Sequence, residues 1–325
     1  MRKTSIGMKT PMAAVVALCL GLSCMATAGG SASGTSVQAA NADEPGAPAV
    51  SLANRMEASL GRIQGKEAQV AYLPAMQLRW AVRSKATATG GVFRKHKSSK
   101  EIIAPFDQAL LQRVLVALQD DLATRFEAAG WHAVTAGELG ADLPQMKTLK
   151  PNAELGVPLF KYDDTINAHD YVVIALPGAA PMDAKAISNG MAIQRFLKGK
   201  QGLNANIVYT FAPGTVGETD SRMLGTEAGA GLWFSARADL NGAERGGWGN
   251  INTKPEGLVV APDIGTLAEI AGSKAGTAEN VIRFIGGMGG VDRTGYQMTP
   301  DWAKAEAAMI SAGKAFNAEL VARLK

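Results

Sequence analysis

Residues 105–130 read PFDQALLQRVLVALQDDLATRFEAAG, and this stretch decides the fold. Its apolar residues recur every three or four positions, namely Leu111, Val114, Leu115, Leu118, Leu122 and Phe126. That spacing predicts an amphipathic helix from Pro105 to Ala129, which buries one face against other elements. Gly130 tolerates the left-handed conformation that closes a helix, so the helix is expected to end there and WHAV to return into the core as a strand.

Helical segments are expected on both sides of this one. TAGE has the capping-box pattern, with Thr135 and Glu138, and predicts a short helix near residues 136–142. The closing segment 299–325 predicts a long helix with Thr299 as its cap and Pro300 at its first position. Residues 51–63 also place apolar side chains at helical spacing, whereas residues 191–197 fit one turn of helix or a strand equally well.

Extended segments lie between these helices. AQVAYLP (68–74) and QLRWAV (77–82) predict a strand, and the alternation of Met76, Leu78 and Trp80 with Gln77 and Arg79 indicates that one face of it is buried. DYVVIALP (170–177) is a compact apolar run and predicts an interior strand. Further strands are expected at NIVYTF (206–211), GLWFSARADL (231–240) and EGLVVAPDI (256–264), and the join at 240–255 suits a hairpin or a longer exposed loop.

These segments together predict an α+β fold, a central mixed sheet with packed helices and a C-terminal helix. The composition agrees, because 47% of the residues are hydrophobic and 19% are charged, as in globular domains. Residues 51–325 are expected to form a single domain after a Gly-, Ser-, Ala- and Pro-rich linker at 29–50.

The amino terminus has the pattern of a signal peptide over residues 1–28. Arg2, Lys3 and Lys9 precede the uncharged apolar run of residues 12–22, which is too short to span a bilayer. Ala26 and Ala28 form the small-x-small pattern of a cleavage site. The expected location is therefore the periplasm or outside the cell, with no second membrane span.

Cys24 opens an alternative, because a cysteine after such an apolar run is also the site of lipid attachment. The residue three places earlier is Gly21 rather than a large aliphatic one, so the match is incomplete. A lipidated Cys24 would anchor the chain at the outer membrane. The only cysteines are Cys19 and Cys24, so a chain cleaved at Ala28 has no thiol, disulfide or cysteine metal ligand.

The charge pattern contains one basic segment in a nearly neutral protein. Without the three basic residues of the leader, 30 basic residues face 29 acidic ones, which argues against nucleic-acid binding by bulk charge. Residues 68–100 nevertheless contain no acidic residue, and the positive charge gathers in FRKHKSSK, at Arg94, Lys95, His96, Lys97 and Lys100. This segment has two interpretations. It binds an anionic envelope surface or an acidic protein partner, or it is a solvated loop after a turn at Gly90-Gly91.

A second candidate is the acidic segment YDDTINAHD (162–170), which holds Asp163, Asp164, His169 and Asp170 beside Tyr162. Carboxylates next to an imidazole are the groups that general-base chemistry uses, so a periplasmic hydrolase is the alternative function. Turn aspartates that cap local backbone amides explain the same pattern without a function. His132, in the expected strand WHAV, is interpreted as structural.

Other signatures of catalysis and cofactor binding are missing from the sequence. There is no GxSxG motif, and GGMGGVDRTG (286–295) lacks the spacing of a phosphate-binding loop, so flexibility is its expected property. The three histidines are not paired at helical spacing as zinc ligands are. We therefore expect no cofactor, no metal site and no nucleic-acid partner, while the oligomeric state stays open.

The order of elements resembles that of the curli-export lipoprotein family and of the amino-terminal domain of TolB-type periplasmic proteins. The resemblance lies in QVAYLP, LATRFEAAGWHAVTAGEL, DYVVIAL and GLWFSARADLNG, and it covers residues 67–260. It implies an α/β periplasmic domain that assembles with other components or assists export, with no catalytic site to carry over. The chain departs from the family around Cys24, and no pore-forming role is transferred. The expected function is thus that of an exported, non-enzymatic envelope protein that acts through binding or assembly.

Overall fold

The computed structural model describes residues 52–60, 70–90, 96–163, 167–183, 187–218, 226–242, 247–254, 257–270 and 291–325. The chain divides into two units, residues 1–36 and 37–325, and all described residues belong to the second. Cys24, Arg94, Lys95 and Asp164 lie outside the described residues, as do the predicted signal peptide and the predicted linker.

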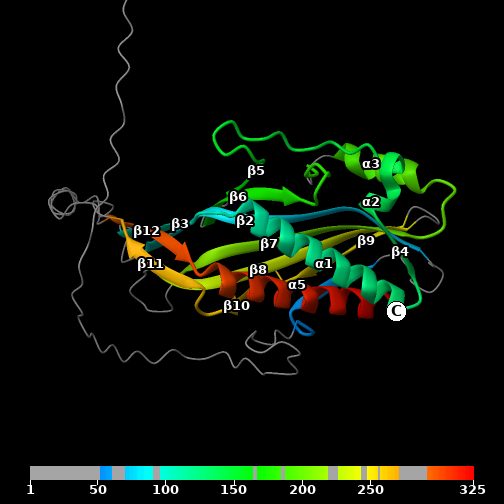
Figure 1. Ribbon diagram of the computed structural model, residues 1–325. Helices are drawn as coiled ribbons and strands as arrows, with labels where there is room; N and C mark the ends of the chain where they lie inside the picture. The colour runs from blue at the N-terminus through cyan, green and yellow to red at the C-terminus, as the bar shows by residue number, and fades with distance from the viewer. Residues whose placement is uncertain are drawn as a thin grey trace, which may run out of the picture. The chain divides into compact units, whose positions relative to one another are not determined.

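A mixed sheet of twelve strands forms the centre of the described part (Figure 1). Its longest path runs in the order β1, β9, β8, β7, β2, β3, β12, β11, while β10 pairs with β8, β4 and β6 pair with β2, and β5 pairs with β6. The strands are β1 (Met56–Ser59), β2 (Val70–Gly90), β3 (His96–Ile103), β4 (His132–Thr135), β5 (Leu159–Asp163), β6 (Asn167–Ala175), β7 (Leu203–Glu218), β8 (Thr226–Gly242), β9 (Trp248–Thr253), β10 (Leu258–Ala261), β11 (Gly265–Glu269) and β12 (Val291–Pro300).

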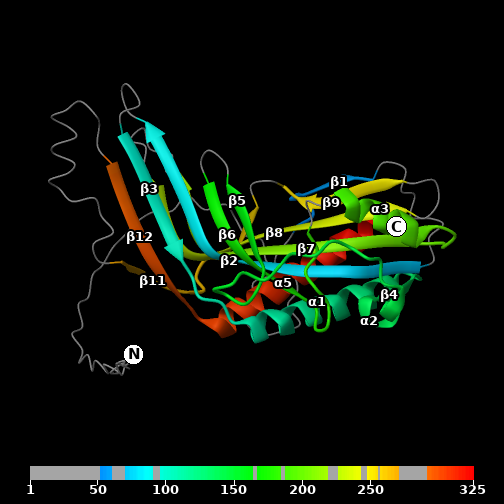
Figure 2. The same ribbon diagram turned by 90° about the horizontal axis from the view of Figure 1, so that it is seen from above.

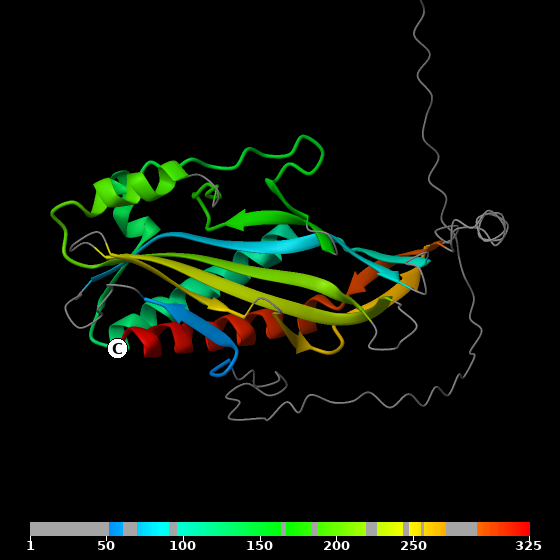
Figure 3. The same cartoon turned by 180° about the vertical axis from the view of Figure 1, so that it is seen from behind.

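The helices are α1 (Gln108–Ala128), α2 (Ala136–Leu139), α3 (Ile187–Leu197) and α5 (Trp302–Leu324), with a short 3-10 turn at Gly140–Asp142 after α2. Helices α1 and α5 pack side by side on one face of the sheet, and α3 lies on the opposite face (Figures 1 and 3). The predicted α+β fold with a central mixed sheet and a C-terminal helix is therefore confirmed.

Helix α1 forms as its sequence predicts. The Asp107 carboxylate accepts a hydrogen bond from the backbone N–H of Leu110 at 3.0 Å and so caps the first turn. Gly130 follows the helix with a φ of 83°, a conformation that glycine adopts without strain. Beyond it, WHAV continues into β4, which runs parallel to β2, and Glu138 accepts from the Thr135 backbone N–H as the capping box predicts.

Strand β2 pairs with four other strands of the described sheet. It pairs antiparallel with β3 and β6 and parallel with β4 and β7 (Figure 2). On the helix-covered face Leu78 and Trp80 are fully buried, and the Trp80 indole N–H donates to the Pro105 carbonyl at 2.9 Å. Trp80 also packs against Trp302 of α5, with ring centroids 5.5 Å apart, so both long helices are attached to this strand.

Three local predictions are wrong. Met56–Ser59, predicted as part of a helix, pairs with β9 as strand β1, because sheet pairing overrides a short run at helical spacing. Thr299 does not cap α5 and Pro300 does not begin it, since both pair with β11 and the Asp301 carboxylate caps the helix instead. A loop is also expected for the basic segment, but its residues from His96 to Lys100 belong to strand β3, and β2 before it continues to Gly90.

The structure also shows the conformation of several segments that the sequence pattern did not assign. Residues 191–197 belong to helix α3, and the join after β8 is a hairpin into β9. Part of GGMGGVDRTG, expected to be flexible, is strand from Val291 onward, parallel to β3. His132 is exposed at the start of β4 rather than buried in the core, with its Nδ1 3.2 Å from the Glu127 carboxylate.

Candidate binding site on the open face of the sheet

The basic segment lies only partly within the described residues. His96, Lys97 and Lys100 are on β3, where Lys97 pairs with both Thr89 and Val291. The Lys100 ammonium donates to the Thr294 hydroxyl at 3.0 Å and is half-buried. Lys100 is therefore engaged within the sheet, while the side chains of His96 and Lys97 lie outside the described residues.

The acidic segment forms the β5–β6 hairpin, and strand geometry separates its groups. His169 pairs with Tyr162 and with Ser84 of β2, and its Nδ1 lies 3.1 Å from the Ser84 hydroxyl. Asp170, the next residue, faces the other side of the sheet, where it lies 3.5 Å from Arg83. The imidazole and the Asp170 carboxylate therefore point in opposite directions and do not form one site. Asp163 pairs with Ala168 and is exposed on the Asp170 side.

A metal site is not found in the described part of the chain, where no three His, Cys, Asp or Glu side chains gather as ligands. None of the helices in that part is long and apolar enough to cross a membrane.

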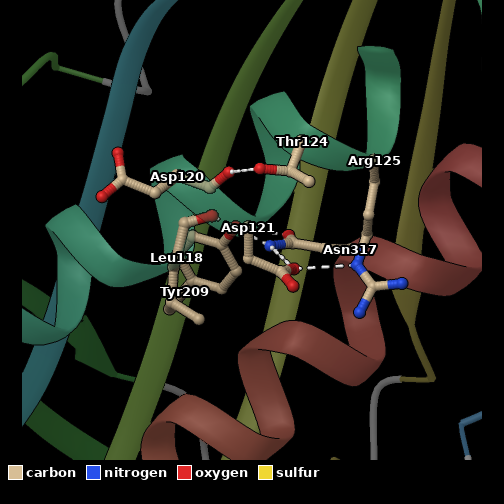
Figure 4. A network of polar contacts seen from close by, with 7 residues as sticks. All are labelled: Leu118, Asp120, Asp121, Thr124, Arg125, Tyr209 and Asn317. Carbon is tan, nitrogen blue, oxygen red and sulfur yellow. Dashed lines mark hydrogen bonds and ion pairs between the residues drawn. The ribbon is translucent and has the colours of Figure 1, made fainter. Parts of the chain in front are cut away.

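A polar cluster in the core joins α1, α5 and β7 (Figure 4). The Tyr209 hydroxyl donates to Asn317 Oδ1 at 2.6 Å, and Asn317 Nδ2 donates to the Leu118 carbonyl and to Asp121 Oδ2, both at 3.0 Å. Arg125 completes the cluster by pairing with Asp121 at 2.9 Å. Burial raises the pKa of Tyr209, so its hydroxyl stays protonated. All these groups satisfy one another between packed elements, which indicates a structural role.

The most distinctive site lies on the face of the sheet opposite α1 and α5, where β2, β7, β8, β9 and β5 surround a hollow of 340 Å³. Alternation along β2 turns Gln77 and Arg79 to this face, because Leu78 and Trp80 face the helices. The hollow is lined by Arg79, Phe160, Val208, Thr210, Ser235, Ala236, Arg237, Asp239, Asn252, Thr253 and Lys254.

Arg79 is the unusual group in this hollow. Its guanidinium carbon lies 3.9 Å from the centroid of the Phe160 ring, which covers one side of the cation. Burial lowers the pKa of Arg79 to about 10; Arg237 acts in the same direction, whereas Tyr171, Asp183 and Asp239 act in the opposite one. Within the described residues Arg79 forms no ion pair, and its Nε has no hydrogen-bond partner. Arg79 is thus a half-buried cation without a direct ion pair among the described residues, although the Asp183 and Asp239 carboxylates lie near enough to act on it.

The surroundings of Arg79 are predominantly positive. Arg237 and Lys254 also line the hollow, and Asp239, the one carboxylate among the described residues that line it, is paired with Arg237 at 2.7 Å. A second hollow of 440 Å³ shares Phe160 as a wall and is lined by Lys150, Lys161 and Asp183 together with Leu149, Asn152 and Leu159. The two hollows together present more cations than carboxylates, which favours an anionic ligand.

Three carboxamides are buried next to the first hollow. Gln77 on β2 and Asn204 and Asn206 on β7 are 2%, 0% and 2% exposed, and they share the face of Arg79. Within the described part, both polar atoms of Gln77 and of Asn204, and Oδ1 of Asn206, have no hydrogen-bond partner. Each buried amide left unpaired costs roughly 1–3 kcal/mol of stability, so this cluster weakens the fold.

The sequence carried a faint signal for this site. Gln77 and Arg79 alternate with apolar residues, but alternation in a half-buried strand normally means that the polar face meets solvent. The cover over that face comes from α3 and from the segments around Lys147 and Asp183, whose positions follow from tertiary packing. The lack of an ion pair for Arg79 among the described residues likewise depends on the folded structure and could not be predicted from the sequence pattern.

Comparison with known proteins finds no family model that matches the sequence, no similar curated protein and no similar solved structure.

Proposed function

We propose that the chain is an exported protein of the bacterial envelope that binds an anionic ligand without catalysing a reaction. The observation that supports binding most directly is Arg79, a half-buried cation that lines a hollow and forms no ion pair among the described residues. A carboxylate or phosphate of the ligand would supply the missing charge and hydrogen-bond acceptor, and a charge-assisted pair out of water is strong.

Support for binding rather than hydrolysis comes from the acidic segment. A general base must share one pocket with the groups it serves, and His169 and Asp170 face opposite sides of the sheet. The Tyr171 hydroxyl beside Arg79 is no better base, because burial raises its pKa. The groups around Arg79 can position an anion, and the Asp239 carboxylate beside it is paired with Arg237 at 2.7 Å.

The proposal that the chain is exported rests on its amino-terminal sequence. A signal peptide over residues 1–28 would deliver the domain to the periplasm or out of the cell, and attachment at Cys24 would instead hold it at the outer membrane. The basic segment around Arg94 and Lys97 would add a second, weaker contact with anionic envelope components. The resemblance to envelope assembly proteins points the same way.

The test is an anion titration of residues 29–325, purified without the leader. Inorganic phosphate and acetate are titrated while the backbone amides of Thr210, Ser235 and Asn252 are followed by NMR. We expect saturable shifts at these amides in the wild type and their loss in Arg79→Gln, because the substitution removes the unpaired charge.

The matched control is Arg113→Gln, which removes an exposed arginine of α1 paired at 3.5 Å with Glu306. It should titrate as the wild type does. Equal shifts in the wild type and in Arg79→Gln, or no saturable shift in the wild type, would overturn the proposal.

A further inference from the structure

The buried carboxamides next to Arg79 are the feature that anion binding leaves unexplained. A hollow that held only a small anion would need no more than Arg79 and its charged neighbours. Gln77, Asn204 and Asn206 are nevertheless buried with polar atoms that lack partners in the described part of the chain. Native proteins pair nearly all such groups, and those left unpaired in a structure call for a specific explanation.

Register places these amides beside the hollow. Gln77 pairs with Val208, which lines the hollow, and Asn206 pairs with Asp239, which also lines it. Gln77 is two residues from Arg79 along β2, about 7 Å at the rise of a strand. The carboxamides therefore continue the polar surface of the hollow toward Asn204 and the end of the sheet that lies under α3.

Helix α3 covers this end of the face (Figures 1 and 3). Tyr72, the register partner of Asn204, meets Phe196 of α3 edge-on, with ring centroids 5.3 Å apart. Lys200 lies over the Phe196 ring at 4.6 Å, and Asn189 ties the start of the helix to the backbone of Lys147 and Asp183. These contacts hold α3 in place largely through polar groups and two rings.

Helix α3 is attached to the sheet by fewer buried apolar side chains, among those described, than helices α1 and α5 are. Of the α3 side chains that the structure describes, Asn189, Ile193 and Leu197 are buried, whereas α1 and α5 bury continuous apolar stripes. A helix with few buried apolar contacts, lying over amides that lose hydrogen bonds by being covered, is displaced more easily than the rest of the fold. Displacement of α3 would open the carboxamides to a ligand.

We infer that the binding site extends from Arg79 under α3, and that its ligand is a glycan that carries a carboxylate. The carboxylate lies on Arg79, and hydroxyl groups of the sugar rings occupy Gln77, Asn204 and Asn206 once α3 has moved aside. This inference rests on the proposed function, because Arg79 supplies the anionic end of the site.

Sugar hydroxyls fit this surface for two reasons. Each donates and accepts a hydrogen bond, as a carboxamide does, so one amide satisfies two hydroxyls and is itself satisfied. The backbone groups of β2 and β7 are already paired with neighbouring strands on both sides, so a peptide could not add to them as a further strand. The ligand must be recognised by side chains, and the Phe160 ring offers a flat apolar wall beside them.

The experiment compares two probes on residues 29–325. The first is β-D-glucuronosyl-(1→4)-glucose, which carries a carboxylate and several hydroxyls, and the second is acetate, which carries the carboxylate alone. Binding is measured by calorimetry for the wild type, for the double variant Gln77→Met/Asn206→Leu, for Arg79→Gln, and for the control Gln297→Met, which changes an exposed glutamine on β12.

We expect the wild type to bind the disaccharide at least tenfold more tightly than acetate. The double variant should lose that advantage while keeping its acetate affinity. Its thermal midpoint should rise by about 2–4 °C, because apolar side chains replace unpaired buried amides. Gln297→Met should change neither binding nor the midpoint, and Arg79→Gln should weaken both probes.

Two results would overturn the inference while leaving the proposed function intact. One is a disaccharide affinity equal to that of acetate in the wild type, with Arg79 still required for both. The other is a double variant with a lower thermal midpoint and unchanged disaccharide binding, which would show that the amides are paired internally and structural. If neither probe depends on Arg79, the proposed function fails as well.

Discussion

At the scale of single residues, Asn317 and Gln77 show opposite uses of a buried carboxamide. Asn317 uses both its donor and its acceptor, to Tyr209, Leu118 and Asp121, and so fixes α5 against α1 and β7. Gln77 has no hydrogen-bond partner among the described residues. The first arrangement stabilises the fold, and the second costs stability that the proposed ligand would return.

Asn317→Leu tests the first arrangement. We expect it to lower the free energy of unfolding by about 2–3 kcal/mol, because the Tyr209 hydroxyl remains buried without its partner and the hydrogen bonds to the Leu118 carbonyl and to Asp121 are lost. Urea unfolding followed by circular dichroism measures the change. Tyr209→Phe should cost about 1 kcal/mol.

In the double variant Tyr209→Phe/Asn317→Leu, the loss of unfolding free energy should be smaller than the sum of the losses in the two single variants, because both single variants remove the same hydrogen bond. Fully additive losses would show that the two residues act independently and that the cluster is not a unit.

At the scale of elements, the contact of α1 with α5 depends on a glycine. A Cβ added at Gly313 would meet the Leu118 side chain of α1, which is fully buried and has little room to move. Gly313→Ala should therefore lower the free energy of unfolding by about 1–3 kcal/mol through overpacking, although alanine favours a helix by about 1 kcal/mol.

The effect of Gly313→Ala on the free energy of unfolding should change sign when Leu118 is shortened. In a Leu118→Ala background the space at Gly313 is open, so adding Gly313→Ala should raise the free energy of unfolding, by up to about 1 kcal/mol. Chemical denaturation of the four variants of this cycle measures both values. A loss of the same size in both backgrounds would place the strain elsewhere than at Leu118.

Most elements could be predicted from the sequence because their patterns are local. The stripe that includes Leu118 and Leu122, the turn at Gly130 and the alternation around Trp80 each identify an element within one window of residues. Met56–Ser59 and Thr299-Pro300 could not be assigned this way, since pairing with β9 and β11 decides their conformation. The site around Arg79 was missed for the same reason, because its cover comes from residues far away in the sequence.

At the scale of the whole molecule, the proposed export makes the amino terminus of the mature chain the point that would decide how the domain meets a ligand. We expect mass spectrometry of the protein recovered from cells to show an amino terminus at Gly29, in agreement with the small residues Ala26 and Ala28. A chain beginning at an acylated Cys24 would contradict this and show that the linker at 29–50 tethers the domain to a membrane. Cys24→Ser serves as the control, since it should leave the amino terminus at Gly29 unchanged.

The position of β2 at the centre of the sheet has a kinetic consequence. Ala71 near its start pairs with Leu203, and Trp80 packs against Trp302, so its contacts join segments far apart in the sequence. Chains rich in such distant contacts fold slowly, because long loops must close before native pairing is rewarded. The core is completed only when α5 covers the sheet with the buried side chains of Phe316 and Leu320. Slow folding of this kind would suit the proposed export, because a protein that is threaded across a membrane must still be unfolded when it crosses.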